Sequence, residues 1–267
     1  MGLRFCSFAS GSTGNCYLVR TDDTAVLVDC GISGKRIMEG LGSFGLDAHD
    51  LSAILITHEH QDHIMSIRMM AKKADNADIY ATKGTIEGIG DKVPSGRITR
   101  IAPGDSFTIG DIEVGSFDVS HDANEPVGYT LSSEGRKLSI LTDTGLVTES
   151  IYDHVRSSNA MVLEANHEVN ILRAGPYPYE LQQRILGKYG HLSNEAAGDL
   201  ICRMLDDGDF TEDSPYILLA HLSRQNNTPD QAMLTVRNVL FEHDHYVGQD
   251  VRMCAASFSE MGPEIEV

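Results

Sequence analysis

The segment LSAILITHEHQDHI, residues Leu51–Ile64, decides the fold because it ends an apolar run in a cluster of metal-binding side chains. Its first half, LSAILIT, is the kind of continuous apolar run that forms a strand buried on both faces. Its second half runs from His58 to His63, and five of these six residues can bind a metal ion or transfer a proton. A strand that ends in such a cluster indicates a site at the edge of a sheet.

The spacing inside this cluster predicts two pairs of ligands. Residues i and i+2 of an extended segment point the same way, so His58 and His60 can bind one ion. Asp62 and His63 lie where the loop enters the next predicted helix, so they can face a second ion. Imidazole suits Zn, Mn, Fe or Ni, whereas carboxylates favour harder ions. We therefore expect two divalent ions about 3.5–4 Å apart, and Zn and Mn both tolerate these ligands.

Three further apolar runs also end in a residue that can bind metal. SFDVS ends at His121, KLSILT ends at Asp143 and YILLA ends at His221. The ends of neighbouring strands can gather at one edge of a layered fold, where a rigid sheet holds the loops that build a site. The repetition of this pattern on four separate runs is stronger evidence for a site than any single histidine.

The order of strand and helix patterns predicts an α/β protein. Strands occur in two groups, each followed by helices, which favours one domain over residues 1–267 with two sheets face to face and helices outside. HIMSIRMMAKKAD, residues 63–75, predicts a single helix. Ser193 and Thr228 are predicted N-caps of two later helices, and Gln231 is predicted to complete a capping box in the second of them.

Composition limits the classes of function. The 267 residues carry a net charge of −18, from 39 acidic and 21 basic residues. This balance argues against a general nucleic-acid binder, although divalent ions could still let an enzyme grip nucleic acid locally. The five cysteines are widely spaced, which argues against a disulfide framework or a cysteine zinc site. The absence of a long apolar run or a signal-peptide pattern predicts a cytoplasmic protein with no membrane partner.

HEHQDH matches the signature H-x-H-x-D-H of the metallo-β-lactamase superfamily, and single histidine, aspartate and histidine residues follow it in the order of that family. The resemblance implies a four-layered αβ/βα sandwich, two mixed β-sheets with helices on both outer faces, and a dinuclear metal site. It also implies a ligand set. One ion would be held by His58, His60 and His121, the other by Asp62, His63 and His221, and Asp143 would bridge the two.

The surrounding sequence resembles one branch of this superfamily, the YycJ/VicX (WalJ) subfamily. The stretches FASGSTGNCYLV, VLVDCGIS, GHLSNEAA and AHLSRQNN carry the resemblance. That branch is regarded as nuclease-like with proposed DNA exonuclease activity, which favours DNA over RNA as the substrate, in single-stranded or 5′-phosphorylated form, and leaves RNA open. Asp29, at the end of VLVD, matches the first motif of the superfamily and is expected to support the ligand loop.

His191 and Glu164 support the nuclease branch. His191 precedes a capped helix, as does the RNase Z histidine that is thought to protonate the leaving group, and Glu164 matches the acid that orients it. The resemblance implies that a metal-bridging hydroxide attacks phosphorus while His191 acts as general acid. Asp62, His191 and Glu164 are therefore the expected catalytic residues.

Two segments are expected to contact the substrate. His167 departs from the RNase Z pattern, and it is expected either to line the substrate groove or to replace a ligand of the second ion. The loop SRQNN follows His221, and its residues Ser223, Arg224 and Asn226 are expected to contact phosphate or sugar, with Arg224 as the positive anchor.

Three functions remain open from the sequence. The first is a metal-dependent nuclease, the second a small-molecule hydrolase of the same fold, such as a glyoxalase-II-like thioesterase or a lactonase, and the third a non-catalytic regulatory protein that binds metal. His191 with Glu164 favours the first over the second, and the complete ligand set argues against the third. The acidic net charge is the main point against the first. Nothing in the sequence indicates an oligomeric state.

Overall fold

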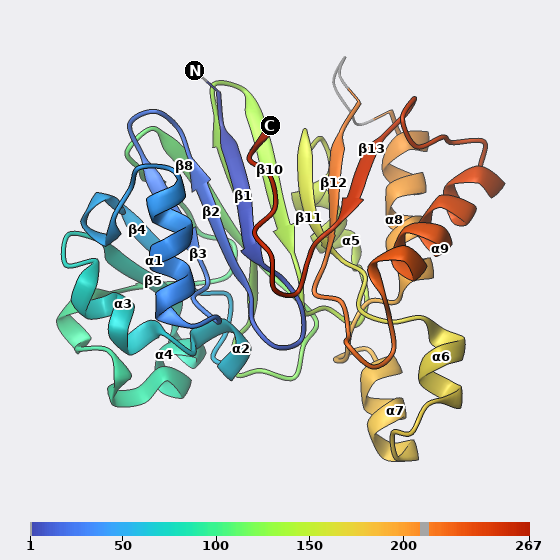
Figure 1. Cartoon of the computed structure of the whole chain (residues 1–267), viewed down its shortest axis with the longest axis horizontal. Coiled ribbons are helices and arrows are strands. Elements are labelled where there is room, and N and C mark those ends of the chain that lie inside the picture. The colour runs from blue at the N-terminus through green and yellow to red at the C-terminus, as the bar shows by residue number, and fades with distance from the viewer. Residues whose placement is uncertain (1, 209–213) are drawn as a thin grey trace. The chain divides into compact units, whose positions relative to one another are not determined.

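The computed structural model describes residues 2–208 and 214–267 (Figure 1). The chain divides into two compact units. Unit 1 comprises Met1–Asp118, Ala123–Gly135 and Ser257–Val267, and unit 2 comprises Val119–Asp122 and Arg136–Ala256. The prediction of a single domain over residues 1–267 stays a prediction.

Unit 1 contains a seven-stranded mixed sheet of order β14-β1-β2-β3-β4-β5-β6. Neighbouring strands are antiparallel from β14 to β3 and parallel from β3 to β6. The bounds are β1 Arg4–Ala9, β2 Cys16–Arg20, β3 Ala25–Val28, β4 Ala53–Leu55, β5 Asp78–Thr82, β6 Ile98–Ile101 and β14 Ile265–Glu266. Three antiparallel strands of the second sheet also belong to this unit, namely β7 Ser106–Ile109, β8 Ile112–Asp118 and β9 Val127–Ser133.

The helices of unit 1 lie in the connections of its first sheet (Figure 1). They are α1 Gly34–Ser43, α2 Gln61–Ile64, α3 Ile67–Lys73 and α4 Lys83–Ile89, with short 3₁₀ turns at Ala48–Asp50, Gly90–Lys92 and Ser95–Arg97. The prediction of one helix over residues 63–75 is wrong, because two helices meet at Ser66. The Ser66 N–H donates to Cys30 O at 2.9 Å and its hydroxyl donates to Ile32 O at 2.6 Å. These bonds to the loop after β3 hold the chain out of a continuous helix.

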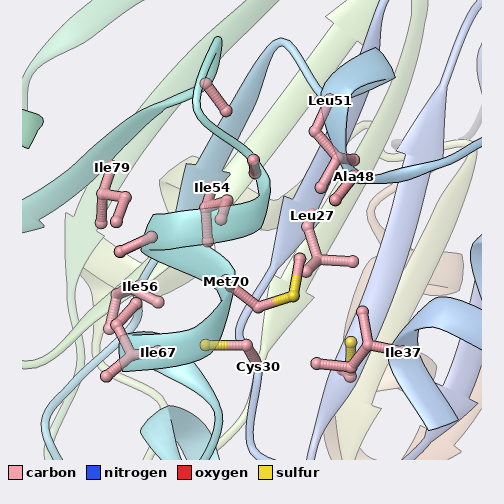
Figure 2. Close-up of a cluster of buried hydrophobic side chains, with 14 of the residues drawn as sticks. Leu27, Cys30, Ile37, Ala48, Leu51, Ile54, Ile56, Ile67, Met70 and Ile79 are labelled. Carbon is pink, nitrogen blue, oxygen red and sulfur yellow. The ribbon is translucent and has the colours of Figure 1, made fainter. Parts of the chain in front are cut away.

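The core of unit 1 lies between the first sheet and the helices α1 and α3 (Figure 2). Leu27 of β3 and Ile54 of β4 point toward Ile37 of α1 and Met70 of α3, and all four side chains are fully buried. Burying a side chain of this size contributes about 1.5–3 kcal/mol to stability. The core thereby fixes β4, which leads to the predicted metal ligands of this unit, and β3, which leads to Asp29.

Unit 2 contains the parallel strands of the second sheet, in the order β13-β12-β11-β10. The bounds are β10 Arg136–Leu141, β11 Ala160–Glu164, β12 Tyr216–Ala220 and β13 Arg252–Ala255, and the helices are α5 Glu149–Val155, α6 Val169–Ala174, α7 Tyr179–Leu186, α8 Asn194–Asp206 and α9 Pro229–Glu242. Every residue of β11 is buried, as expected for a parallel strand covered on both faces. In this register Glu164 of β11 pairs with Ala220 of β12, so the ends of these strands lie at the same edge.

The predicted helix caps of unit 2 are confirmed, with one correction. The Ser193 hydroxyl accepts from Ala196 N at the start of α8, and the Thr228 hydroxyl accepts from Gln231 N at the start of α9. The prediction of a capping box at α9 is wrong, because the hydrogen bond from Thr228 N to the Gln231 side chain does not form. The Thr228 N–H donates to Asn227 Oδ1 at 3.0 Å, and the amide group of Gln231 bonds instead to Thr235 Oγ1.

The two sheets are mixed and carry helices, which confirms the predicted α/β class. All five cysteines lie in the described residues and are free thiols, as expected. Across the described ranges, no helix has both the length and the apolar character that a bilayer crossing requires.

Candidate metal centre

In unit 1 the structure brings together the four predicted ligands of the HEHQDH segment, which follows β4 and forms the first turn of α2. The ring centres of His58 and His60 lie 4.6 Å apart, and those of His58 and His63 lie 4.1 Å apart. Asp62 Oδ2 lies 3.6 Å from His63 Nε2. His58 and His63 are buried, whereas the other two are partly exposed. The segment therefore presents two imidazoles from the loop after β4, and a carboxylate and a third imidazole from α2.

The Asp29 carboxylate forms hydrogen bonds to both ends of the ligand segment. Asp29 is fully buried after β3, and its carboxylate accepts hydrogen bonds from Thr57 N at 2.9 Å, from Thr57 Oγ1 at 2.9 Å and from His63 Nδ1 at 2.7 Å. The backbone adds a further tie, because Cys30 N donates to His63 O at 2.9 Å. One carboxylate thus fixes both ends of the ligand segment.

Gly31 is needed where this loop approaches the end of β3. A Cβ atom at Gly31 would lie 1.6 Å from Asp62 O and 2.7 Å from His63 N. No side chain fits at these distances, so the glycine lets two backbones touch at the start of α2. The positions of Asp62 and His63 therefore depend on the absence of a side chain at Gly31.

In unit 2 a second set of predicted ligands surrounds Asp143, which follows β10. Asp143 Oδ1 lies 3.4 Å from His221 Nε2 and 3.7 Å from His121 Nε2. All three side chains are buried. Asp143, Glu164, His191 and His221 each offer a ligand atom within 4.8 Å of the others. The structure thus places a buried carboxylate between histidines of different strand ends in this unit.

Glu164 organises two of these histidines. Its Oε1 accepts from His191 Nδ1 at 2.8 Å and from His221 Nδ1 at 3.0 Å, while its Oε2 accepts from the N–H groups of Thr144 and Leu192. Burial raises the pKa of Glu164, but the charge of His191 and the hydrogen bonds from both imidazoles outweigh burial and lower it to about 2. The residue is therefore a fully ionised acceptor in this unit.

His191 has the position that a general acid requires. Its side chain is 22% exposed, and its Nδ1 also lies 3.7 Å from Asp143 Oδ1. Burial lowers the pKa of His191, but the negative charge of Glu164 and the hydrogen bond to it outweigh burial and raise the pKa above its usual value. Because Nδ1 faces Glu164, the Nε2–H is left to donate a proton elsewhere.

Three strand ends in the two units share an uncommon backbone conformation. Asp29 after β3, Asp143 after β10 and His221 after β12 have positive φ angles of 59°, 57° and 51°. This left-handed region is uncommon for residues other than glycine, although Asp and His tolerate it better than most. Such residues persist only where their surroundings fix them, and they cluster at functional sites.

The imidazoles are oriented as metal binding requires. The Nδ1 atoms face oxygen acceptors: Thr57 Oγ1 for His58 (3.1 Å), Asp29 for His63, Gly190 O for His121 (3.2 Å) and Glu164 for His221. A proton on Nδ1 leaves the lone pair on Nε2, which is the arrangement that ligating histidines adopt in proteins. Burial also lowers the pKa of His121, which keeps that ring neutral. The residues of each unit therefore fit a divalent ion.

The four residues that were predicted to contact substrate differ in their exposure to solvent. Arg224 is exposed, but Ser223 and Asn226 are buried, and the Ser223 hydroxyl accepts from the Asn226 N–H within the turn. His167 is also buried, and in the described part of the chain neither of its ring nitrogens has a hydrogen-bond partner. Burial lowers the pKa of His167 to about 4, so the ring is neutral. Contact of these four residues with substrate stays a prediction.

Sequence reasoning missed two residues that position the ligands. Thr57 bridges Asp29 to His58, and Asn166 donates to His221 O at 2.8 Å. Thr57 directly precedes the ligand segment and Asn166 directly precedes His167. Their positions next to these motifs could have indicated a supporting role.

Replacing Asp29 by asparagine should weaken metal binding about 10- to 100-fold, because the carboxylate that fixes His63 is lost. Asparagine also tolerates the left-handed backbone, so the fold should survive. Chelator competition would measure the metal affinity, with circular dichroism as a check on folding. Asp111→Asn is the control, since that acid also accepts from a threonine of unit 1, at 2.8 Å, but lies outside the ligand loop. An unchanged affinity in Asp29→Asn would contradict the role of Asp29.

Comparison with known proteins identifies similar chains over nearly the whole length. The model described as "Beta-lactamase superfamily domain" matches residues 24–206. The exodeoxyribonuclease YycJ of Bacillus anthracis is 41% identical over 252 residues, which cover 93% of each chain. The exodeoxyribonuclease WalJ of Streptococcus pneumoniae is 38% identical, and the match covers 100% of this chain and 99% of WalJ.

A solved structure supports the same fold. The metallo-β-lactamase fold protein YhfI from Bacillus subtilis has a TM-score of 0.72 to this chain at 17% sequence identity. The match covers 98% of this chain and 100% of YhfI. This likeness confirms the fold class that the H-x-H-x-D-H signature predicts.

Proposed function

This chain belongs to the metallo-β-lactamase superfamily, and we propose that it is a metal-dependent exodeoxyribonuclease. Its relatives YycJ and WalJ bear that name at 41% and 38% identity over nearly the full chain. The observation that carries the proposal is the pair Glu164–His191, joined at 2.8 Å beside Asp143 and His221. Cleavage of the phosphodiester of DNA is assisted by such an acid, because the departing sugar oxygen is a poor leaving group unless it takes up a proton.

The ligand assignment of the superfamily signature is part of this proposal. The proposed ligands are His58, His60 and His121 for one ion, Asp62, His63 and His221 for the other, and Asp143 as the bridge. The Nδ1 hydrogen bonds of four of these histidines support the assignment, because they direct Nε2 lone pairs outward. Zn and Mn both suit such ligands.

The residues of this chain then divide the remaining work of hydrolysis. Divalent ions bound here would activate water and neutralise the charge that develops on the phosphate. His191 donates a proton from Nε2 to the leaving oxygen, and Glu164 keeps the ring in that orientation. Arg224, exposed beside His221, contacts a phosphate of the strand. The substrate is DNA, single-stranded or 5′-phosphorylated, and the cytoplasmic location stays a prediction.

The Mn-loaded and Zn-loaded protein should shorten 5′-phosphorylated single-stranded DNA and release nucleotides. Gel analysis of end-labelled strands would measure this activity, with matched RNA and 5′-hydroxyl strands beside it. A chelator should stop the reaction and added metal should restore it, because every ligand above serves a divalent ion. Intact DNA together with turnover of a thioester or lactone would overturn the proposal in favour of a small-molecule hydrolase.

A further inference from the structure

Residues 169–190 of unit 2, which include α6 and α7, form a segment with almost no core of its own. Between Val169 and Tyr189, all of them described, only Leu172 is buried. Figure 1 shows α6 and α7 beside each other and away from the strands β10–β13. An amphipathic pair of helices normally buries one face, so an arrangement this open indicates a surface that serves another molecule.

The exposed side chains of this segment include large rings. Tyr179 is 70% exposed and Tyr189 is 53% exposed, and Ile171 on α6 is 40% exposed. Tyr177 is half-buried, and its carbonyl accepts from Gln182 Nε2 at 2.9 Å, which ties the start of α7 to the turn before it. Exposed tyrosines on an ordered backbone offer flat faces on which nucleobases can stack.

The charge of the segment is opposite to that of the chain. Residues 169–190 hold three basic residues and one acidic residue, whereas the whole chain holds 21 basic and 39 acidic residues. Arg184 pairs with Asp122 beside His121. Arg173 and Lys188 are exposed, and Lys188 Nζ lies 4.6 Å from the centre of the Tyr189 ring. A ring and a positive charge thus occur side by side.

The segment is continuous with the candidate centre of unit 2. His191 N donates to Ile185 O at 3.0 Å, so α7 holds the first residue after the segment. Gly190 O accepts from His121 Nδ1 at 3.2 Å. A Cβ atom at Gly145, two residues after Asp143, would lie 2.3 Å from Gly187 O. A strand bound on this surface would therefore reach His191 and Asp143 within the same unit.

We propose that residues 169–190 form a binding surface for single-stranded polynucleotide. Bases stack on Tyr179 and Tyr189, and backbone phosphates bind Arg173 and Lys188. The proposal rests on the proposed nuclease function and adds the residues that guide a strand to His191. It also accounts for DNA binding by an acidic protein, because the repulsive net charge of −18 is relieved locally where the strand must lie.

Substitution of the two rings tests the proposal. Fluorescence anisotropy would follow a single-stranded phosphorothioate oligothymidylate, which resists cleavage, on the metal-loaded protein. Tyr179→Ala with Tyr189→Ala should raise Kd by about 20-fold or more, since each base–tyrosine stack contributes at least about 5-fold. Tyr179→Phe with Tyr189→Phe should bind like the wild type, because the rings remain. Arg173→Ala with Lys188→Ala should reduce the slope of log Kd against log salt by about 1 to 1.5.

Two controls separate this proposal from the proposed function. Tyr246→Ala removes another exposed tyrosine of unit 2, 42% exposed, and should leave binding unchanged. Hydrolysis of bis(p-nitrophenyl) phosphate should be equal in all variants, since that substrate is too small to reach the tyrosines. Wild-type binding by the double alanine variant, with DNA cleavage retained, would refute this surface alone. An altered molecular mass with unchanged DNA affinity would identify it as a contact between copies of the chain, and absence of any DNA binding would refute both proposals.

Discussion

Asp143→Ala should reduce kcat/KM for DNA by about 10³-fold or more and should lower the metal content of the protein. Loss of a residue that only supports a ligand typically lowers metal affinity or activity 10- to 100-fold. Asp143 lies between two candidate ligands and is itself a proposed ligand, so its loss should lower activity further. Its Oδ1 is 3.4 Å from His221 Nε2 and 3.7 Å from His121 Nε2. Metal analysis after gel filtration and nuclease assays at saturating metal would measure both effects.

The Asp143 result needs controls for charge and backbone. Asp143→Asn retains the size of the side chain and its tolerance of the left-handed backbone, so it isolates the charge. It should lose activity nearly as fully as the alanine variant. Asp153→Ala, which removes an acid of α5 that is 67% exposed, should match the wild type. Full metal content and activity in Asp143→Asn would show that this carboxylate does not bind the ions.

His191→Ala should lower kcat by about 10² to 10⁴-fold for DNA and leave the metal content unchanged. The reason is that the Nε2–H donates a proton to the leaving oxygen, whereas the ligand set does not need this ring. The loss should shrink greatly for bis(p-nitrophenyl) phosphate, whose leaving group departs as an anion without a proton. Steady-state kinetics with both substrates would measure the difference. An equal loss on both would instead indicate that His191 only supports the structure of the site.

Glu164→Gln tests the same pair through pH. The negative charge of Glu164 raises the pKa of His191 against the opposing effect of burial. The acid works when it is protonated, so activity falls as pH rises through this pKa. Without the charge the pKa decreases, and the fall in kcat/KM should move to lower pH. If the fall in kcat/KM stays at the same pH, the charge of Glu164 does not set the pKa of His191. Metal analysis would show whether the variant still holds its metal, because Glu164 also accepts a hydrogen bond from the candidate ligand His221 at 3.0 Å.

His58, His121, Asp143 and His221 could be predicted from the sequence because each directly follows an apolar run. A buried parallel strand is readable as a continuous apolar stretch, and the side chain at its end is then placed at a sheet edge. His58, Asp143 and His221 were found in this way. Their assignment to particular ions came from the resemblance to the superfamily and remains a proposal.

Other features depend on contacts between segments far apart in the chain. The break between α2 and α3 arises where Ser66 bonds to residues before α1, and no periodicity in residues 63–75 encodes that contact. The bond from Thr57 to Asp29 spans 28 positions in the same way. The open surface of α6 and α7 also escaped prediction, because the apolar spacing of α7 resembles that of a helix with a buried face.

The left-handed backbone at the ends of β3, β10 and β12 has a consequence for engineering the centre. A designer who wishes to change its metal preference would exchange ligands, for example histidine for cysteine or aspartate for glutamate. At the ligands Asp143 and His221, and at Asp29, which supports the ligand loop, the incoming residue must also accept a positive φ, at a cost of about 1–3 kcal/mol where it is poorly suited. Libraries at these three positions should therefore be restricted to Asp, Asn, His and Gly, while His58, His60 and Asp62 can be varied more widely.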